Sequence, residues 1–586
     1  MTNRSVLVWL RLPFGDRERV LLLAAVAGLL GAATAALFRY AIYAVLNLYA
    51  VVHLVAHATR SLVELASAMP TWERVLFPTV GGLVAGGILM LGSRLPSTTD
   101  YMEAIVIGDG RMDVRTTLTK SLSSLVSIVS GGSIGREGSM VQLGALSSSL
   151  LARMVALPVT SRPLIVACGA AAGIASVYDA PLAGALFVAE VVMGTMAVEV
   201  LGPLMVAAVI ASATSRYLFH AEPLYMSHAP ALSSLWQLPL YGLFGIAAGI
   251  LAPLYLGALD GMRRLFSGLG GAVCWKLMIG GAMVGIISAI EPMVWGNGNH
   301  VISSLLSSSW LLGALGVLII AKIAATAATT GSGAVGGVFT PTLAIGAAFG
   351  AALSVLAHHV APGLAPDPAA GALVGMGAFL AATTQAPVMA MLMVFEMSLD
   401  SDLILPLMLS CIAAHYLVQV VGCPALYNMG GKHRERTATL PAWSRLSVRD
   451  LVQPTGLTVR RSASFADIAK AFRRHSFNFI FVVDEDGTYR GALSMHDLKE
   501  HLSDDALDQV AVAQDLLIEI PVLRGGDDLN RAIEAFGRFP GNRVPVLDEG
   551  GRIIGCVHKY DLMVAFARGP GSQDSRAEPS DPVAAR

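Results

Sequence analysis

Long apolar stretches recur between residues 20 and 428 and alternate with short polar segments. Examples start at Val20 (VLLLAAVAGLLGAATAALF), Val75 (VLFPTVGGLVAGGILML) and Leu311 (LLGALGVLIIAKIAATAA). Several are long enough to span a bilayer core of about 30 Å as helices. After about residue 440 the apolar runs become short, and this last quarter of the chain holds about half of the charged residues. The pattern predicts a helical membrane domain followed by a soluble domain.

Two of the apolar segments, 129–150 and 330–350, are too interrupted by glycine and proline to be simple spans. Irregular backbone at membrane depth is tolerated only where it is buried in protein or lines a cavity. The first segment contains GGSIGREGSMVQLG (131–144), with Arg136 and Glu137 between glycines. A glutamate on a solvated loop would need no explanation, but a carboxylate in this setting is a candidate functional group.

The membrane domain contains an internal repeat. ACGAAAGIASVYDAPLAGALFVAE, from Ala167, resembles GMGAFLAATTQAPVMAMLMVFE, from Gly375. The matched positions are Gly169 with Gly377, Ala180-Pro181 with Ala386-Pro387, and Glu190 with Glu396. Small-residue motifs also recur in helical membrane proteins because they allow close packing. We interpret the match as two halves, each with a broken helix followed by an Ala-Pro helix.

Composition agrees with a membrane protein. Hydrophobic residues make up 54% of the chain and charged residues 14%, and the mean hydropathy is +0.64. The five cysteines are scattered without metal-ligand spacing, and the pair His53 and His57 lacks a third ligand, so we expect no metal site. The chain also lacks the arrangement of a nucleophile and a base that an enzyme would need, and we expect no nucleic-acid partner.

The residues of the broken segments favour an anion as substrate. Apart from Arg136 and Glu137 they offer glycines, hydroxyls and bare backbone, not the clustered carboxylates of a cation pathway. N–H groups at a helix N-terminus attract anions, and glycine lets the backbone approach an ion closely. A divalent-cation transporter is therefore disfavoured.

At these residues the chain resembles the CLC family of chloride channels and chloride/proton antiporters. GREGS (135–139) resembles that family's Gly-(Arg/Lys)-Glu-Gly-Pro motif, GVFTP (337–341) its Gly-x-Phe-x-Pro motif, and PALYNM (424–429) its final pore segment. The resemblance runs from about residue 20 to about residue 430. Within the family, the chain looks most like the second bacterial paralogue, described as a voltage-gated chloride channel. The resemblance implies a homodimer with one pore per subunit.

The resemblance also implies roles for individual residues. Glu137 corresponds to the gate, whose carboxylate takes the place of a chloride ion until it is protonated. The implied chloride contacts are Gly135, Arg136, Gly138, Val338, Phe339 and Tyr427. Tyr427 has a second interpretation, an aromatic residue at the membrane interface.

The chain departs from the family pattern at three places. Ser139 replaces the proline of the first motif. The family's pore-serine motif is absent from LPSTTDYMEA (95–104), where Ser97 is a possible substitute. The position of the inner proton-relay glutamate is Val191, which cannot carry a proton and favours passive conduction.

Lys322 is a further charge inside an apolar run. Two roles remain open for it: raising the positive potential near the pore, or pairing with a backbone carbonyl at a helix end.

The tail contains a second repeat, FNFIFVVDEDGTYRGALSMHDL (477–498) and GNRVPVLDEGGRIIGCVHKYDL (541–562). Each copy reads as strand, acidic turn, strand and helix start, and together they resemble a pair of CBS domains. In nucleotide-binding pairs, a serine or threonine and an aspartate hold the ligand. The matching residues here are Ser494, Asp497 and Asp561, with His558 in place of the second hydroxyl. An adenine nucleotide is one expectation, and simple capping of the following helix is the other.

The sequence thus predicts an all-α polytopic membrane protein with an inverted-repeat CLC-type fold and broken helices, followed by a small α/β CBS pair. We expect a bacterial inner-membrane protein with both termini cytoplasmic, because arginine and lysine flank the spans there. The expected function is gated, passive chloride conduction, with chloride/proton antiport as the alternative, fluoride as a variant, and no required cofactor. The expected boundaries are an N-terminal segment 1–19, a pore domain 20–430 with repeats at about 20–220 and 235–430, a linker 431–445, CBS domains 446–505 and 506–566, and a disordered tail 567–586.

Overall fold

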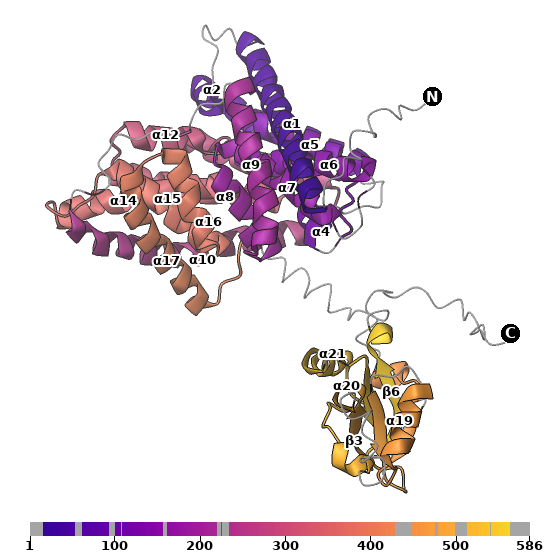
Figure 1. The fold of residues 1–586 in the computed structure, drawn as a ribbon. Coiled ribbons are helices and arrows are strands. Elements are labelled where there is room, and N and C mark those ends of the chain that lie inside the picture. The colour runs from indigo at the N-terminus through magenta and orange to yellow at the C-terminus, as the bar shows by residue number, and fades with distance from the viewer. Residues whose placement is uncertain are drawn as a thin grey trace. The chain divides into compact units, whose positions relative to one another are not determined.

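The protein was studied as a computed structural model. It describes residues 16–52, 61–92, 100–106, 108–155, 157, 161–219, 224–225, 232, 234–427, 447–455, 457–474, 479–498, 512–539 and 541–562. The chain divides into two compact units, Met1–Asn428 and Met429–Arg586, each described here by itself. Figure 1 shows the first as a helical bundle and the second as a small unit of strands and helices.

The first half of the helical unit, coloured indigo to magenta in Figure 1, runs from α1 to α9. Its elements are α1 (Asp16–Val52), α2 (Leu62–Ala68), α3 (Thr71–Gly92), α4 (Tyr101–Val106), α5 (Val114–Val129), α6 (Glu137–Met154), α7 (Arg162–Tyr178), α8 (Pro181–Leu186), a π-helical turn η2 (Phe187–Met193) and α9 (Val198–Phe219).

The second half runs from a short turn before α10 to α17. Its elements are η3 (Leu235–Gln237), α10 (Leu238–Gly268), α11 (Val273–Ile290), η4 (Pro292–Val294), α12 (Asn299–Ser307), α13 (Leu312–Gly331), α14 (Phe339–Val360), α15 (Pro368–Thr384), α16 (Pro387–Ser398), η5 (Ser401–Leu403) and α17 (Ile404–Val421).

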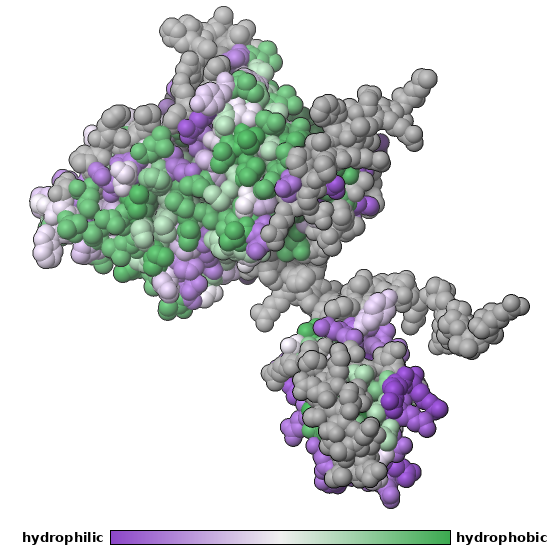
Figure 2. Space-filling view, in the orientation of Figure 1, coloured by the Kyte–Doolittle hydropathy of each residue, from purple (hydrophilic) through white to green (hydrophobic). Residues whose placement is uncertain are grey.

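Among the described residues, eight helices are long and apolar enough to cross a membrane. The face of the helical unit seen in Figure 2 is largely hydrophobic, as expected for a surface that meets lipid rather than water. Its interior contains many small residues, since α7 and α15 are rich in buried alanine and glycine. Such residues let helix backbones approach closely, which replaces the hydrophobic driving force that lipid cannot supply.

The two halves share their local chain signals. The C-cap residues of α7 and α15 are Asp179 and Gln385, and both adopt the left-handed conformation. Each is followed by an Ala-Pro pair whose proline is the first residue of the next helix. Proline is suited to that position because its missing N–H has no intrahelical partner there. The repeat predicted from the sequence is thus present in the fold.

One matched pair of that repeat is corrected by the structure. Gly144 of α6 packs against the carbonyl of Gly169 in α7, and Gly346 of α14 packs against the carbonyl of Gly375 in α15. A side chain at Gly144 or Gly346 would collide with the facing backbone. Gly169 therefore corresponds to Gly375, not to Gly377, because these two glycines occupy the equivalent helix contact in each half.

The second unit contains two three-stranded sheets of the same topology. Its elements are η7 (Val448–Leu451), β1 (Thr458–Arg460), α19 (Phe465–Arg474), β2 (Phe479–Val483), β3 (Tyr489–Ser494), α20 (Met495–Leu498), η9 (Ala513–Leu516), β4 (Leu523–Arg524), α21 (Leu529–Arg538), β5 (Arg543–Leu547) and β6 (Ile553–His558). The orders are β1-β2-β3 and β4-β5-β6, each with one parallel and one antiparallel pairing.

The two copies exchange their leading segments. Gln453, which precedes the first sheet, pairs with Cys556 of the second, and Ile518, which precedes the second sheet, pairs with Ala492 of the first. Arg543 adds a side-chain link, donating to the carbonyls of Thr455 and Phe479. Each sheet is therefore completed by the other copy.

Candidate functional site

The two broken segments predicted from the sequence meet directly in the helical unit. The N–H of Gly135 donates to the carbonyl of Gly337 (2.6 Å), and the N–H of Gly337 donates to the carbonyl of Gly135 (2.9 Å). α6 starts at Glu137 and α14 starts at Phe339, so this pairing brings the two helix N-termini together. Their first N–H groups lack intrahelical acceptors, and the helix dipoles add positive potential at the same place.

The carboxylate of Glu137 lies at this junction and is only 3% exposed. Its Oε1 accepts from the N–H of Thr340 (3.1 Å) and its Oε2 accepts from the Thr340 hydroxyl (3.0 Å). A side chain at Gly135 or Gly337 would overlap the carboxylate, so glycine at both positions makes the space that it fills. The two glycines thus admit the carboxylate, and Thr340 binds it.

A second hydroxyl extends the contact. Tyr178, at the end of α7, lies 2.8 Å from the Thr340 hydroxyl, oxygen to oxygen, and is fully buried. Because the single hydroxyl proton of Thr340 is donated to the carboxylate, the Tyr178 hydroxyl is the donor to Thr340. The arrangement is a chain of hydrogen bonds that ends on Glu137.

Aromatic rings surround this chain. The Tyr178 ring packs on Phe339 (5.2 Å between centroids), Phe339 on Phe187 (5.9 Å), and Phe187 edge-on against Tyr427 (5.7 Å). Tyr427, predicted as a pore residue, is thereby placed in the same aromatic cluster as the first residue of α14.

The chemistry available at this site is reversible binding of a negative charge. An N–H group, a hydroxyl and two helix N-termini suit a carboxylate and a halide equally, because both are anions that accept hydrogen bonds. Among the described residues, no group of three or more His, Cys, Asp or Glu side chains is placed to hold a metal ion.

Comparison with known proteins identifies the family to which the chain belongs. The model of the family described as voltage gated chloride channel matches residues 81–419. This chain belongs to the CLC family of chloride channels and transporters. A ClcB-like chloride channel protein from Ralstonia nicotianae is 46% identical over 395 residues, which cover 66% of this chain and 92% of that protein. The voltage-gated ClC-type chloride channel ClcB of Salmonella typhimurium is 38% identical over 416 residues, covering 70% and 98%.

Solved structures share the fold of this CLC chain. A slow cyanobacterial Cl−/H+ antiporter aligns with a TM-score of 0.62 at 23% identity, covering 73% of this chain and 99% of that one. A eukaryotic CLC transporter aligns with a TM-score of 0.57 at 18% identity, covering 95% and 99%. The family resemblance and the fold class predicted from the sequence are confirmed.

The other predicted anion contacts lie around the same junction. Val338 is the N-cap residue of α14, and its carbonyl accepts the first hydrogen bond of that helix, from the N–H of Thr342. The N–H groups of Val338 and Phe339 come before this bond and therefore have no acceptor within the helix. Gly138 lies in the first turn of α6, against Gly336 and Gly337. The N–H of Gly135 is engaged by Gly337, as described above. The side chain of Arg136 lines a separate pocket behind α6.

The repeat glutamates of this CLC chain bind each other's helices. Oε2 of Glu190 accepts from the N–H of Met389 (2.9 Å) at the start of α16. Glu396 accepts from the N–H groups of Leu182 (3.0 Å) and Ala183 (2.8 Å) at the start of α8. Each carboxylate therefore caps the N-terminus of the equivalent helix in the other half. Val191, next to Glu190, lies in η2.

Lys322 is 1% exposed and its ammonium group donates to the carbonyls of Val294 and Gly296, both at 2.9 Å. Of the two interpretations offered for it, pairing with backbone carbonyls is the one observed. These carbonyls belong to the end of η4 and the residues after it, not to a long helix. Ser97, His53 and His57 lie outside the described residues.

The CBS resemblance of the tail is confirmed by the CBS domain model, which matches residues 448–504 and 514–568. Ser494 is buried at the end of β3, and Asp497 follows in α20. In the second copy, Asp561 accepts from the side-chain amide of Gln453 (2.9 Å). The carboxylate of the second copy is thus engaged within the protein.

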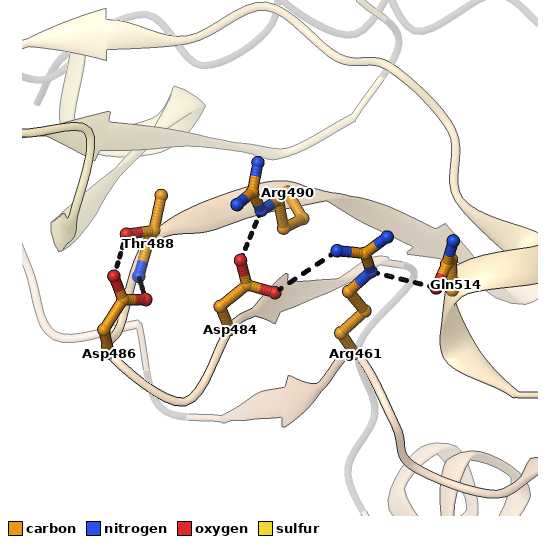
Figure 3. Close-up of polar contacts among 6 residues, drawn as sticks. All are labelled: Arg461, Asp484, Asp486, Thr488, Arg490 and Gln514. Carbon is orange, nitrogen blue, oxygen red and sulfur yellow. Dashed lines mark hydrogen bonds and ion pairs between the residues drawn. The ribbon is translucent and has the colours of Figure 1, made fainter.

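Polar contacts also stabilise the turn of the first CBS copy, as Figure 3 shows. Asp484 is held by Arg490 (2.5 Å) and by Arg461, which in turn donates to Gln514 of η9. The backbone N–H and the hydroxyl of Thr488 bind Asp486 and hold the pKa of that carboxyl below its usual range. These contacts connect the residue after β2, Asp484, with β3 and, through Arg461, with η9.

Two site residues were missed by sequence reasoning. Thr340 occupies the variable position of the GVFTP motif, and a threonine in the first turn of a helix is usually only a cap-region residue. Tyr178 is far from Glu137 in the sequence and belongs to an apolar helix. The sequence signal that could have identified Thr340 and Tyr178 is that each places a hydroxyl group inside an otherwise apolar segment.

Proposed function

We propose that this protein is a gated chloride channel that conducts anions passively, with Glu137 as the gate. The observation that carries the proposal is the position of the Glu137 carboxylate, bound by both donors of Thr340 between the N-termini of α6 and α14. A carboxylate at a site built for an anion excludes chloride while it is charged. Protonation or movement of the side chain releases the site.

Passive conduction is supported by the residue at position 191. The family resemblance assigns the inner proton relay of antiporters to this position, and valine has no titratable group. A chloride/proton antiporter that uses the same pore is the alternative function. Its support is the shared fold of the cyanobacterial antiporter, which is evidence of fold alone at 23% identity.

The remaining chloride contacts are proposed as a path through the junction. The N–H groups of Val338, Phe339 and Gly138 and the hydroxyl of Tyr427 would receive the anion after Glu137 has moved, with Arg136 contributing charge. Gly135 would contribute space. We propose that the protein works as a homodimer in a bacterial inner membrane with both termini in the cytoplasm, which suits the exposed apolar residues of α9 and α17.

Chloride efflux from liposomes tests the gate. The purified protein is reconstituted with a chloride gradient, and valinomycin with potassium dissipates the voltage. Wild-type efflux should rise as the pH falls into the range where carboxylates protonate. Glu137→Gln should keep a high efflux that no longer depends on pH, because a neutral amide does not mimic an anion. Unchanged pH dependence in Glu137→Gln would exclude Glu137 as the gate, and no anion flux in either protein would exclude the pore.

A further inference from the structure

A small pocket lies behind α6, next to Arg136 at the start of that helix. It is formed where α1, α6, α7 and α9 pack together, a group that can be followed in Figure 1. Its polar lining consists of Arg39, Arg136, Ser176 and Ser215, and alanine, methionine and valine residues complete it. Glu137 does not line it, so the pocket is separate from the gate.

The pocket joins two positive charges inside the membrane unit. Arg39 lies in the second half of α1, a candidate span, and Arg136 is the N-cap residue of α6. Both arginines line the same small pocket, so their guanidinium groups repel each other, and the described residues that line the pocket include no carboxylate. Arg136 is also attracted by Glu137, the residue that follows it in the chain. An arginine at membrane depth is costly, and a pair of them needs a compensating negative charge.

Two residues that line the pocket carry buried donors without a partner among the described residues. Nε of Arg136 is one, and the hydroxyl of Ser176, a residue that is only 5% exposed, is the other. Helix hydroxyls nearby bond back to their own helix, as Thr214 does to the carbonyl of Ile210. Ser176 does not, and it differs from the other unpaired hydroxyls of the helical unit in lining the same pocket as Arg136, whose Nε is also unpaired. Both guanidinium groups are pure donors, so the missing partner is an acceptor.

We propose that this pocket is an anion-binding site that takes one small inorganic anion, such as chloride. The pocket has room for about one water molecule or one monatomic ion of slightly larger radius, and this is too little for a tetrahedral oxyanion such as sulfate or phosphate. An anion there offsets the repulsion between Arg39 and Arg136 and accepts from Nε of Arg136 and the hydroxyl of Ser176. The site stands on its own geometry, whereas its role in supplying anions to the pore rests on the function proposed above.

Bromide is the probe for the site, because its anomalous scattering locates it in crystals of the full-length protein. We expect a bromide peak between Arg39 and Arg136, separate from any peak at the junction of α6 and α14. Arg39→Gln should abolish the peak behind α6, and Arg39→Lys should retain it. Arg264→Gln, which removes an exposed arginine paired with Asp260, is the matched control and should leave it unchanged.

The outcomes separate this site from the pore. Peaks at the junction with none behind α6 would overturn the new site and leave the proposed function intact. In crystals of Glu137→Gln, where no carboxylate fills the junction, a peak behind α6 with none at the junction would support the new site and count against the pore. A peak that persists at full height in Arg39→Gln would overturn the assignment of its ligands.

Flux measurements test the role of the site. Removing the Arg39 charge should raise the half-saturating chloride concentration by roughly tenfold with little change in maximal flux, because attraction of the ion is weakened. Arg39→Lys should restore the wild-type value. A chloride dependence of Arg39→Gln equal to that of Arg264→Gln would show that the site does not supply the pore.

Discussion

Thr340 binds both carboxylate oxygens of Glu137, one through its backbone N–H and the other through its hydroxyl. The two residues come from opposite halves of the repeat, and they meet because Gly135 and Gly337 pair the halves at this point. The gate of the proposed channel is therefore bound by the other half of the protein, not by its own helix alone.

The first prediction concerns the hydroxyl of Thr340. Thr340→Val keeps the shape and the N–H donor but removes the hydroxyl that binds Glu137. A hydrogen bond to a charged group contributes about 1.5–3 kcal/mol. Without it, the population of the released form of the gate, relative to the bound form, should rise roughly tenfold or more. Chloride efflux from liposomes at neutral pH should increase. Thr214→Val, which removes a hydroxyl bonded only within α9, is the control and should not change efflux.

The second prediction concerns the donor behind Thr340. Tyr178→Phe removes the hydroxyl that donates to Thr340 and should increase neutral-pH efflux, by less than Thr340→Val does. The double variant should show less than the sum of the two free-energy effects, since both act through one chain of hydrogen bonds. Strictly additive effects in this double-mutant cycle would mean that Tyr178 does not act through Thr340.

The third prediction concerns the exchanged helix caps. Glu190→Ala and Glu396→Ala each leave the first N–H groups of a helix in the other half without their carboxylate. Loss of a cap costs about 0.5–2 kcal/mol, so both variants should unfold at a lower temperature in detergent. Glu199→Ala, at an exposed position in the first turn of α9, should have little effect. Equal melting temperatures for all three variants would contradict the capping role.

The fourth prediction concerns the tail. The guanidinium of Arg543 in β5 donates to the carbonyls of Thr455 and Phe479, and it lies 5.8 Å from the Phe481 ring centroid. Arg543→Leu removes these links between the CBS copies and should destabilise the tail unit by about 1–3 kcal/mol. Limited proteolysis of the full-length protein should cleave the tail faster. Arg531→Leu, which loses only a surface ion pair with Glu534, should resemble the wild type.

The sequence predicted the parts of the site that leave a local signal. Glycine and proline marked the breaks before α6 and α14, and an isolated carboxylate in an apolar region identified Glu137. The Ala-Pro helices with their glutamates revealed the repeat, although the repeat alone did not show that Glu190 and Glu396 cap each other's partner helix. The exchange of caps depends on how the helices of the two halves pack against each other, and the sequence does not show this.

Other contacts depend on tertiary structure alone. Thr340 and Tyr178 each look ordinary within their own helices, and only the fold brings their hydroxyls to Glu137. Arg39 is the only charged residue of the sequence between Val20 and Val52, and its proximity to Arg136 follows from the packing of α1 on α6. For Lys322 the sequence left two roles open, and the fold supplied the two carbonyls that the ammonium group binds.

The central claim is that Glu137 gates a passive chloride path, and coupled flux tests it most directly. Liposomes holding the purified protein are given a chloride gradient and no pH gradient, with voltage dissipated by valinomycin and potassium, and chloride and protons are recorded together. We predict chloride flux without proton movement, and in Glu137→Gln a chloride flux that no longer responds to pH. Protons driven uphill by the chloride gradient in the wild type would contradict passive conduction and identify an antiporter.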